Sequence, residues 1–236
     1  FTREPIKNIF LASMTEYRKG FPSNVIFPKQ YLNLPLGKVI SGYNLRQFRI
    51  AESEKFPHVT YFFNGGLPNP FNKEDRIMIP SPQVATYDLK PEMSALEMTN
   101  MLLSRIDTDA YDFTLVNFAN PDMVGHTGNL QAGIKAIQVV DYCVHELVRL
   151  FLNKGGAVII TADHGNVEEM INIEGGGIDT EHSINPVPII VAGTEKTTST
   201  SLPYGSLRDV APTILDIMGI PQPGEMTGQS LLRNLS

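Results

Sequence analysis

The chain has 236 residues, of which 42% are hydrophobic and 19% are charged, a balance that suits one or two globular domains with a real core. Its net charge of −6 is spread without a long run of either sign, so neither nucleic acid nor an anionic membrane is an expected partner. The single Cys143 excludes an internal disulfide, and no signal peptide or membrane span is recognisable, so we expect a cytoplasmic protein.

The first third of the chain predicts short strands separated by loops. Glycine and proline residues punctuate a loop-rich passage, which indicates a hinge near residues 20–30. Residues 58–63 fit either a strand or a helix. Three short apolar runs predict strands, at residues 9–12, 47–51 and 76–79.

From Ser94 onward, helices and strands alternate. Helices are expected from Ser94, over 129–153 and over 209–218, and strands over 113–118, 158–160 and 187–191. The longest helix has an apolar residue every three or four positions and ends before a Gly-Gly pair. This alternation predicts an α/β fold, with a mostly parallel sheet covered by helices on both faces.

The stretch 157–166 stands out within this pattern. Its apolar run at 158–160 is short enough for a buried strand, and Asp163 and His164 follow directly. A carboxylate and an imidazole at the carboxyl edge of a sheet lie where open α/β sheets bind their ligands. The alternative is that both residues merely cap the next helix.

Three further side chains extend this candidate site. His126 stands four residues after Asp122, beyond the strand at 113–118, and His182 precedes the strand at 187–191. Two aspartates and three histidines from three loops form a mixed oxygen and nitrogen set, which suits Mn²⁺, Zn²⁺ or Fe²⁺ better than Ca²⁺ or Mg²⁺. The spacing therefore predicts a metal site, with a set of unrelated loop caps as the alternative.

The other two histidines are expected to be structural. His145 belongs to the polar face of the long helix, and His58 lies among apolar residues where a hydrogen-bonded, partly buried role is expected. Phosphoryl transfer is the natural use of two metal ions, but it also needs a nucleophile. No serine has a convincing context for that role. The nearest candidates are Ser81, Ser94 and Ser183, of which Ser94 is better explained as a helix N-cap.

Eight segments spread over nearly the whole chain carry a resemblance to a known family. They are Met-Thr-Glu-Tyr at 14–17, Arg-Ile-Ala-Glu-Ser-Glu-Lys at 49–55, Pro-His-Val-Thr at 57–60, Ile-Pro-Ser-Pro at 79–82, Ala-Thr-Tyr-Asp at 85–88, and the segments 117–128, 160–166 and 182–188. In these segments the chain resembles the C-terminal half of the cofactor-independent (2,3-bisphosphoglycerate-independent) phosphoglycerate mutases, in the alkaline phosphatase superfamily. The run Asn-Phe-Ala-Asn-Pro-Asp-Met-Val-Gly-His at 117–126 is the most specific match.

The resemblance implies a reaction and a set of roles. The family interconverts 2- and 3-phosphoglycerate in glycolysis and gluconeogenesis through a phosphoserine, usually with two Mn²⁺ and without 2,3-bisphosphoglycerate. Lys55 matches the lysine that contacts the substrate phosphate. Metal ligands are also implied: Asp122, His126 and His182 for one ion, and Asp163 and His164 for part of the second site.

The resemblance also implies that much of the enzyme lies outside this chain. Residues 1–28 are similar to the end of the family's inserted phosphotransferase domain and hinge, and residues 29–236 to the C-terminal part of its phosphatase-type metal-binding domain. The nucleophilic serine and the remaining ligand of the second metal belong to an N-terminal segment that is absent here. We therefore expect one complete metal site, an incomplete α/β fold of alkaline phosphatase type, and no mutase activity from the chain alone.

Two other interpretations stay open. The chain could be a non-catalytic metal-binding lobe that pairs with a separately encoded N-terminal half. It could also be part of a related phosphomonoesterase or phosphomutase with another substrate, although the specific run at 117–128 argues against this.

Overall fold

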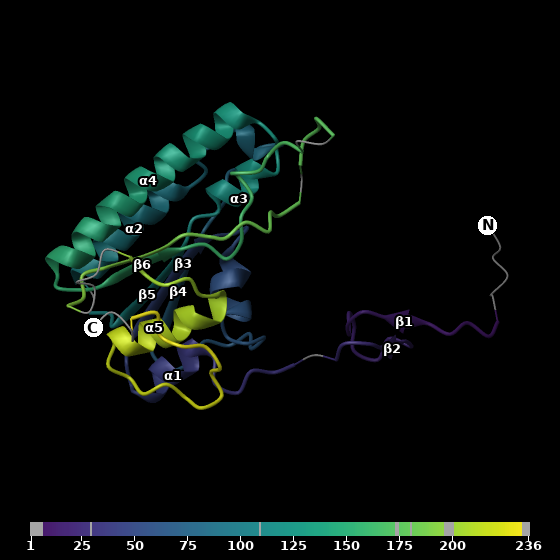
Figure 1. Ribbon diagram of the computed structural model, residues 1–236, viewed down its shortest axis with the longest axis horizontal. Coiled ribbons are helices and arrows are strands. Elements are labelled where there is room, and N and C mark those ends of the chain that lie inside the picture. The colour runs from purple at the N-terminus through teal and green to yellow at the C-terminus, as the bar shows by residue number, and fades with distance from the viewer. Residues whose placement is uncertain are drawn as a thin grey trace. The chain divides into compact units, whose positions relative to one another are not determined.

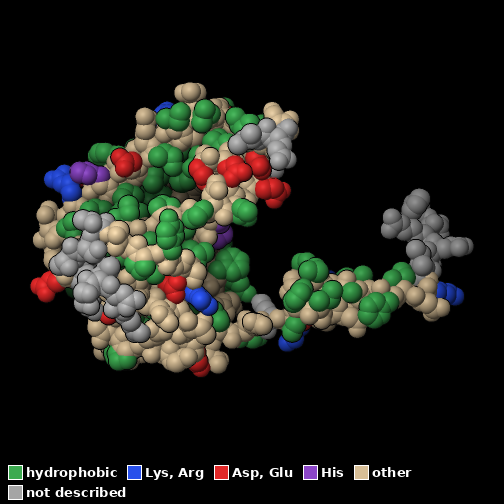
Figure 2. Space-filling view, viewed as in Figure 1, with side chains coloured by type: hydrophobic (Ala, Val, Ile, Leu, Met, Phe, Trp, Pro, Cys, Tyr) green, Lys and Arg blue, Asp and Glu red, His purple; other side chains and the backbone are tan. Residues whose placement is uncertain are grey.

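The computed structural model describes residues 7–28, 30–108, 110–172, 175–179, 181–195 and 201–232. The chain divides into an N-terminal unit, Phe1–Asn33, and a larger unit, Leu34–Ser236. In the N-terminal unit, β1 (Ala12–Ser13) pairs in parallel with β2 (Asn24–Val25). No side chain is buried among its described residues, and hydrophobic side chains lie on its surface (Figure 2). The strand predicted at 9–12 is present but shifted, because pairing begins only at Ala12.

The main sheet of the larger unit has three parallel strands. β3 (Gln47–Glu52) lies between β4 (Glu74–Ile79) and β5 (Phe113–Asn117). Every residue of β3 is buried, since the strand has a neighbour on each edge and helices on each face. The predicted strands at 47–51, 76–79 and 113–118 are therefore confirmed, as is the α/β class.

A second sheet holds the strand that precedes the candidate site. β6 (Val158–Thr161) pairs antiparallel with β7 (Ile189–Ala192) and has no other partner strand among the described residues. The prediction of a buried strand here is wrong: residues 158–160 are half-buried and Thr161 is exposed. The physical reason is that, within the described part of the chain, β6 is paired on one edge only and no neighbouring strand covers its other edge.

Helices form a layer on each face of the sheets (Figure 1). On one face, α2 (Ala95–Thr108) and α4 (Leu130–Asn153) pack together, and α2 supplies Met98, Leu102 and Ile106 to a core shared with β3. On the other face, α1 (Leu36–Gly42) and α5 (Val210–Ile217) meet through a separate cluster that includes Ile40 and Leu215. The predicted helices are thus confirmed, on both faces as expected.

Short helical segments complete the larger unit. A six-residue helix, α3 (Asn120–Gly125), follows β5, and the ambiguous stretch 58–63 forms a π-helical turn, His58–Phe62. Single 3₁₀ turns lie at Tyr87–Leu89 and Leu207–Asp209. None of the described helices combines the length and apolar character that a membrane crossing requires.

Candidate metal centre

The candidate site forms where the segments after three strands meet. Lys55 follows β3, and its backbone N–H donates to the carbonyl of Glu52 at 3.0 Å. Asp122 lies in the first turn of α3, immediately after β5. His164 follows β6, and His182 lies in the segment that leads to β7. Side chains from distant parts of the sequence therefore approach one another because their strands end at the same region of the fold.

Asp122 is at the centre of these contacts. Its side chain is 13% exposed, and its Oδ2 accepts a hydrogen bond from Lys55 Nζ at 2.5 Å. Its Oδ1 lies 3.2 Å from His126 Nε2 and 3.1 Å from His182 Nε2. Burial alone would raise the pKa of the Asp122 carboxyl, but the hydrogen bond and charge of Lys55 and the charge of His126 together lower it. The carboxylate is thus kept ionised, as a metal ligand must be.

Three of the predicted ligands form one compact set. Asp122, His164 and His182 each offer a ligand atom within 4.8 Å of the other two. The rings of His164 and His182 are stacked, with centroids 3.7 Å apart and an angle of 18° between their planes. Two ligand atoms bound to one ion at roughly 2.0–2.2 Å can be at most about 4.4 Å apart. Movements of less than an ångström would therefore bring all three atoms into reach of one divalent ion.

The other two predicted ligands lie at the margin of this set. His126 contacts the Asp122 carboxylate, and its ring centroid is 5.2 Å from that of His182. Asp163 is 57% exposed, and its Oδ2 lies 3.7 Å from His164 Nε2. The structure thus brings His164 to the Asp122 and His182 pair, whereas the resemblance assigns His164 to a second site with Asp163. The set of one carboxylate and imidazoles fits a transition-metal ion.

Two residues beside the candidate ligands were missed at the level of sequence: Asn166 contacts Asp122, and Glu168 contacts Asn166. Asn166 is buried and hydrogen-bonds to Asp122, and Glu168 accepts from the Asn166 backbone N–H, from Asn185 and, at very short range, from Ser183. Burial opposes the shift, but these hydrogen bonds, that of Ser183 above all, lower the pKa of the Glu168 carboxyl. A sequence signal existed in the closeness of both residues to His164.

The remaining candidates are placed as follows. His145 is exposed on α4, with Nε2 4.0 Å from Glu146 Oε1 and away from the site, as predicted. His58 is exposed rather than partly buried, and loss of solvent around its ring together with the charge of Lys55 lowers its pKa. The Ser94 hydroxyl donates to the Pro80 carbonyl at 2.8 Å, which ties the start of α2 to the end of β4.

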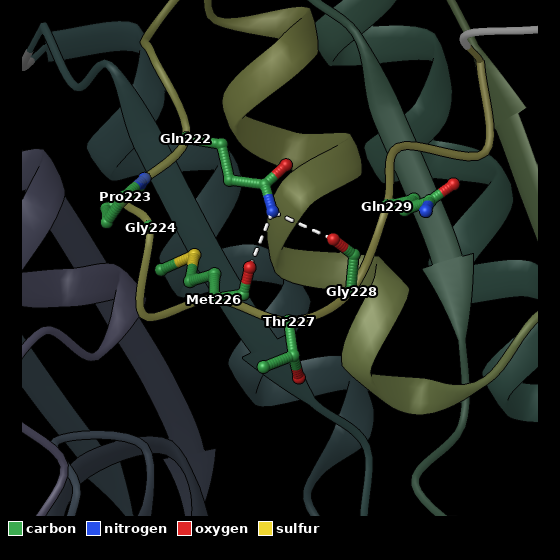
Figure 3. Close-up of a pocket in the computed structure, with 7 residues that line it drawn as sticks. All are labelled: Gln222, Pro223, Gly224, Met226, Thr227, Gly228 and Gln229. Carbon is green, nitrogen blue, oxygen red and sulfur yellow. Dashed lines mark hydrogen bonds between the residues drawn. The ribbon is translucent and has the colours of Figure 1, made fainter.

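A hollow elsewhere on the larger unit offers no comparable chemistry. It is formed by the C-terminal loop and lined by Gln222, Pro223, Gly224, Met226, Thr227, Gly228 and Gln229 (Figure 3). The Gln222 amide already donates to the carbonyls of Met226 and Gly228, at 2.7 and 2.8 Å. With no ionisable side chain in its lining, this hollow is not a candidate active site.

Comparison with known proteins shows which family the chain is similar to. Residues 20–222 match the family described as the Metalloenzyme superfamily. The chain is 51% identical over 233 residues to a 2,3-bisphosphoglycerate-independent phosphoglycerate mutase of Clostridioides difficile, with 98% of the chain and 46% of that protein aligned. It is 52% identical over 220 residues to the enzyme of the same name from Thiobacillus denitrificans, covering 93% of the chain and 42% of that protein.

A solved structure shows the same similarity in three dimensions. The fold matches a crystal structure of Leishmania mexicana phosphoglycerate mutase at low cobalt concentration, with a TM-score of 0.80 and 29% identity. The match covers 92% of this chain and 43% of that one. The chain thus spans less than half the length of the relatives that it matches.

Proposed function

The chain belongs to the Metalloenzyme superfamily, and we propose that it is the C-terminal, metal-binding portion of an enzyme that interconverts 2- and 3-phosphoglycerate. The observation that carries the proposal is the Asp122 carboxylate, which is shared between an ammonium group on one oxygen and two imidazoles on the other. The 51% identity to a phosphoglycerate mutase over nearly the whole chain supports the choice of reaction.

The residues present divide the work in the following way. Asp122, His126 and His182 would hold one Mn²⁺, and Asp163 and His164 would supply part of a second Mn²⁺ site. When bound, such ions activate a hydroxyl nucleophile and stabilise the charge on a transferred phosphoryl group. The stacking of His164 on His182 supports two neighbouring sites, because it brings a ligand proposed for one ion next to a ligand proposed for the other.

Lys55 would bind the phosphate of the substrate. Lys55 is buried, and its ammonium group contacts the Asp122 carboxylate within the candidate site. An ammonium carries three donors, so Lys55 can keep the bond to Asp122 and still donate to a phosphate oxygen. A charge held in this way, away from bulk solvent, orients an anion more strongly than a mobile surface lysine does.

The phosphoserine itself would form on another part of the enzyme. We propose that residues 1–28 are the end of an inserted phosphotransferase domain and that residues 29–236 belong to the phosphatase-type domain. The absence of buried side chains among the described residues of the N-terminal unit supports this, because such a segment needs contacts with further protein to be stable. The N-terminal half of the enzyme is thus the expected partner of this chain.

Metal content per chain, measured by mass spectrometry after gentle purification, tests the site. We expect bound Mn²⁺ in the parent chain, loss of the ion in Asp122→Ala, and little change in Asp163→Ala. Equal metal content in the parent and Asp122→Ala would contradict the assignment of Asp122.

A kinetic experiment tests the reaction. The purified chain should show no mutase activity alone, and addition of the N-terminal half of a relative should restore conversion of 3- to 2-phosphoglycerate. Activity from the chain alone would contradict the proposal that its nucleophile lies elsewhere. A screen of the reassembled enzyme on sugar phosphates separates a mutase from a phosphatase with another substrate.

A further inference from the structure

We propose that Asn166 is a positioning residue that fixes the Asp122 carboxylate and the His126 ring before any metal ion binds. This inference rests on the proposed metal site. It concerns a side chain that is not itself a ligand and that acts through two residues that are.

The contacts of the Asn166 amide nitrogen carry the proposal. Nδ2 donates to Asp122 Oδ1 at 3.0 Å, and it lies 3.2 and 3.3 Å from Nε2 and Nδ1 of His126. The amide NH₂ has two protons, so one can serve the carboxylate while the other faces the imidazole. The orientation of the amide follows from charge, because an amide oxygen turned toward the carboxylate would be repelled.

The two oxygens of Asp122 are held from different sides. Lys55 donates a hydrogen bond to Oδ2, whereas Asn166 donates one to Oδ1, the oxygen that faces His126 and His182. A carboxylate bound at both oxygens cannot rotate freely about its side-chain bonds. Asn166 thereby aims the metal-facing oxygen, and a ligand that is already aimed loses less conformational freedom when an ion binds.

The surroundings of Asn166 hold the amide in place. The residue is 4% exposed, and its backbone N–H donates to Glu168 Oε2 at 2.8 Å. Gly125, in the same short helix as Asp122, provides the space: a Cβ on this glycine would collide with Asn166 Oδ1. The helix α3 therefore supplies both the ligand Asp122 and, at Gly125, the space that the Asn166 side chain occupies.

The amide oxygen argues against a purely structural role. Asn166 Oδ1 is buried and has no hydrogen-bond partner among the described residues. A buried acceptor without a partner is destabilising, so packing alone would favour an apolar side chain here. The presence of an amide side chain at this position is explained by its NH₂ group, which contacts the two proposed ligands Asp122 and His126.

Titration of the full chain with Mn²⁺ by calorimetry tests the proposal. Loss of a hydrogen bond to a metal ligand typically weakens metal binding about 10–100-fold, and we expect this for Asn166→Ala and for Asn166→Leu, which fills the same space without a donor. Gly125→Ala should weaken binding similarly, because the added methyl displaces the amide. The matched controls are Gly42→Ala, in a helix with open space around the glycine, and Asn100→Ala, on the exposed face of α2.

Thermal unfolding without metal and crystal structures without metal provide readouts that do not depend on activity. We expect Asn166→Leu to unfold within a few degrees of the parent while its Asp122 carboxylate is rotated. Binding within twofold of the parent in Asn166→Leu and Gly125→Ala would overturn the positioning role and leave the proposed function intact. Failure of the parent to bind Mn²⁺ would instead contradict the proposed function. In that case the metal-free crystal structures of the parent and of Asn166→Leu test the positioning role. An Asp122 carboxylate in the same orientation in both structures would overturn it.

Discussion

Strands β3 and β6 both lead to the candidate metal centre, but the fold holds them in different ways. β3 has a parallel neighbour on each edge and is buried throughout, whereas β6 has one antiparallel neighbour and is half-exposed. The segment after β3 therefore starts from a strand that is paired along both edges. The described residues between Asp163 and Asn185 are held instead by isolated backbone bridges, such as Gly165 with Ser183, and by side-chain hydrogen bonds. The candidate metal centre therefore joins a half carried by a fully paired strand to a half carried by a partly paired one.

The half carried by β3 is built on a buried polar network. The Arg49 side chain is fully buried and contacts Glu74 Oε2 at 3.2 Å, Asn64 Oδ1 at 2.6 Å and the Val59 carbonyl at 3.1 Å. Burial lowers the pKa of Arg49 to about 10, against the opposing charge of Glu74, so the guanidinium stays charged at neutral pH. This network links β3 to β4 and to the π-helical turn His58–Phe62.

The largest expected effect is therefore the loss of Arg49. Arg49→Met should lower the free energy of unfolding by about 3–5 kcal/mol, because it leaves the buried partners of the guanidinium unsatisfied. Urea denaturation followed by circular dichroism measures this. The control, Arg149→Met on the exposed surface of α4, should change stability by less than about 0.5 kcal/mol. A loss below about 1 kcal/mol for Arg49→Met would show that β3 does not depend on this network.

A smaller effect is expected in the half carried by β6. Glu168→Ala removes the acceptor that joins the backbone of Asn166 to Ser183 and Asn185, and so leaves the segment that carries His182 with fewer contacts, chiefly the backbone bridge between Gly165 and Ser183. We expect Mn²⁺ binding to weaken about tenfold or more, with a loss of stability of only about 1 kcal/mol. Calorimetric titration and chemical denaturation measure the two quantities, with the exposed Glu225→Ala as control. Unchanged affinity would mean that β7 and the backbone bridge between Gly165 and Ser183 position His182 without Glu168.

The two halves should also respond to pH in opposite directions. Burial raises the pKa of the Glu52 carboxyl at the end of β3, an effect that the hydrogen bond from the Ser94 N–H only reduces. A raised carboxyl pKa in the folded state means that stability falls as the pH rises from the unfolded value, about 4.3, through the folded one. Glu52→Gln should therefore gain on the order of 1 kcal/mol at pH 7, and the gain should vanish below about pH 4.

Glu168 behaves in the reverse sense. The pKa of Glu168 is lower in the folded state than in the unfolded state, where it is about 4.3. Glu168 therefore contributes to stability above that unfolded-state pKa, and this contribution is lost as the pH falls through the folded-state pKa. Denaturation curves of Glu52→Gln and the parent from about pH 2.5 to pH 8, together with amide hydrogen exchange of residues 181–185, separate the two responses. A stability difference that is independent of pH would contradict the role given to Glu52.

The smallest effect is expected outside both halves. His145 is exposed on α4 and takes no part in the metal centre, so His145→Ala should leave Mn²⁺ affinity within twofold and stability within about 0.5 kcal/mol of the parent. The same titration and denaturation experiments measure both values. A clear loss of metal binding would show that the histidines of the centre are not the only ones that matter.

Much of the fold was predictable because its signals are local. The apolar spacing of residues 129–153 predicts a helix, and α4 spans Leu130–Asn153 with the side chain of Asn129 accepting from the Ala132 N–H as its N-cap. The central strand β3 was equally clear from its composition. The antiparallel pairing of β6 with β7 was not, because strand direction and edge pairing depend on which segments meet in space.

The sequence by itself determined the class of the fold, the positions of most of its elements, and the residue types that can bind a metal ion. These follow from periodicity and from side-chain chemistry, which are properties of short stretches. Only the tertiary structure decided that Lys55 pairs with Asp122, that His164 stacks on His182, and that Asn166 reaches Asp122 through the space left by Gly125. These contacts join residues from separate loops, and their geometry is set by the packing of the strands and helices that carry them.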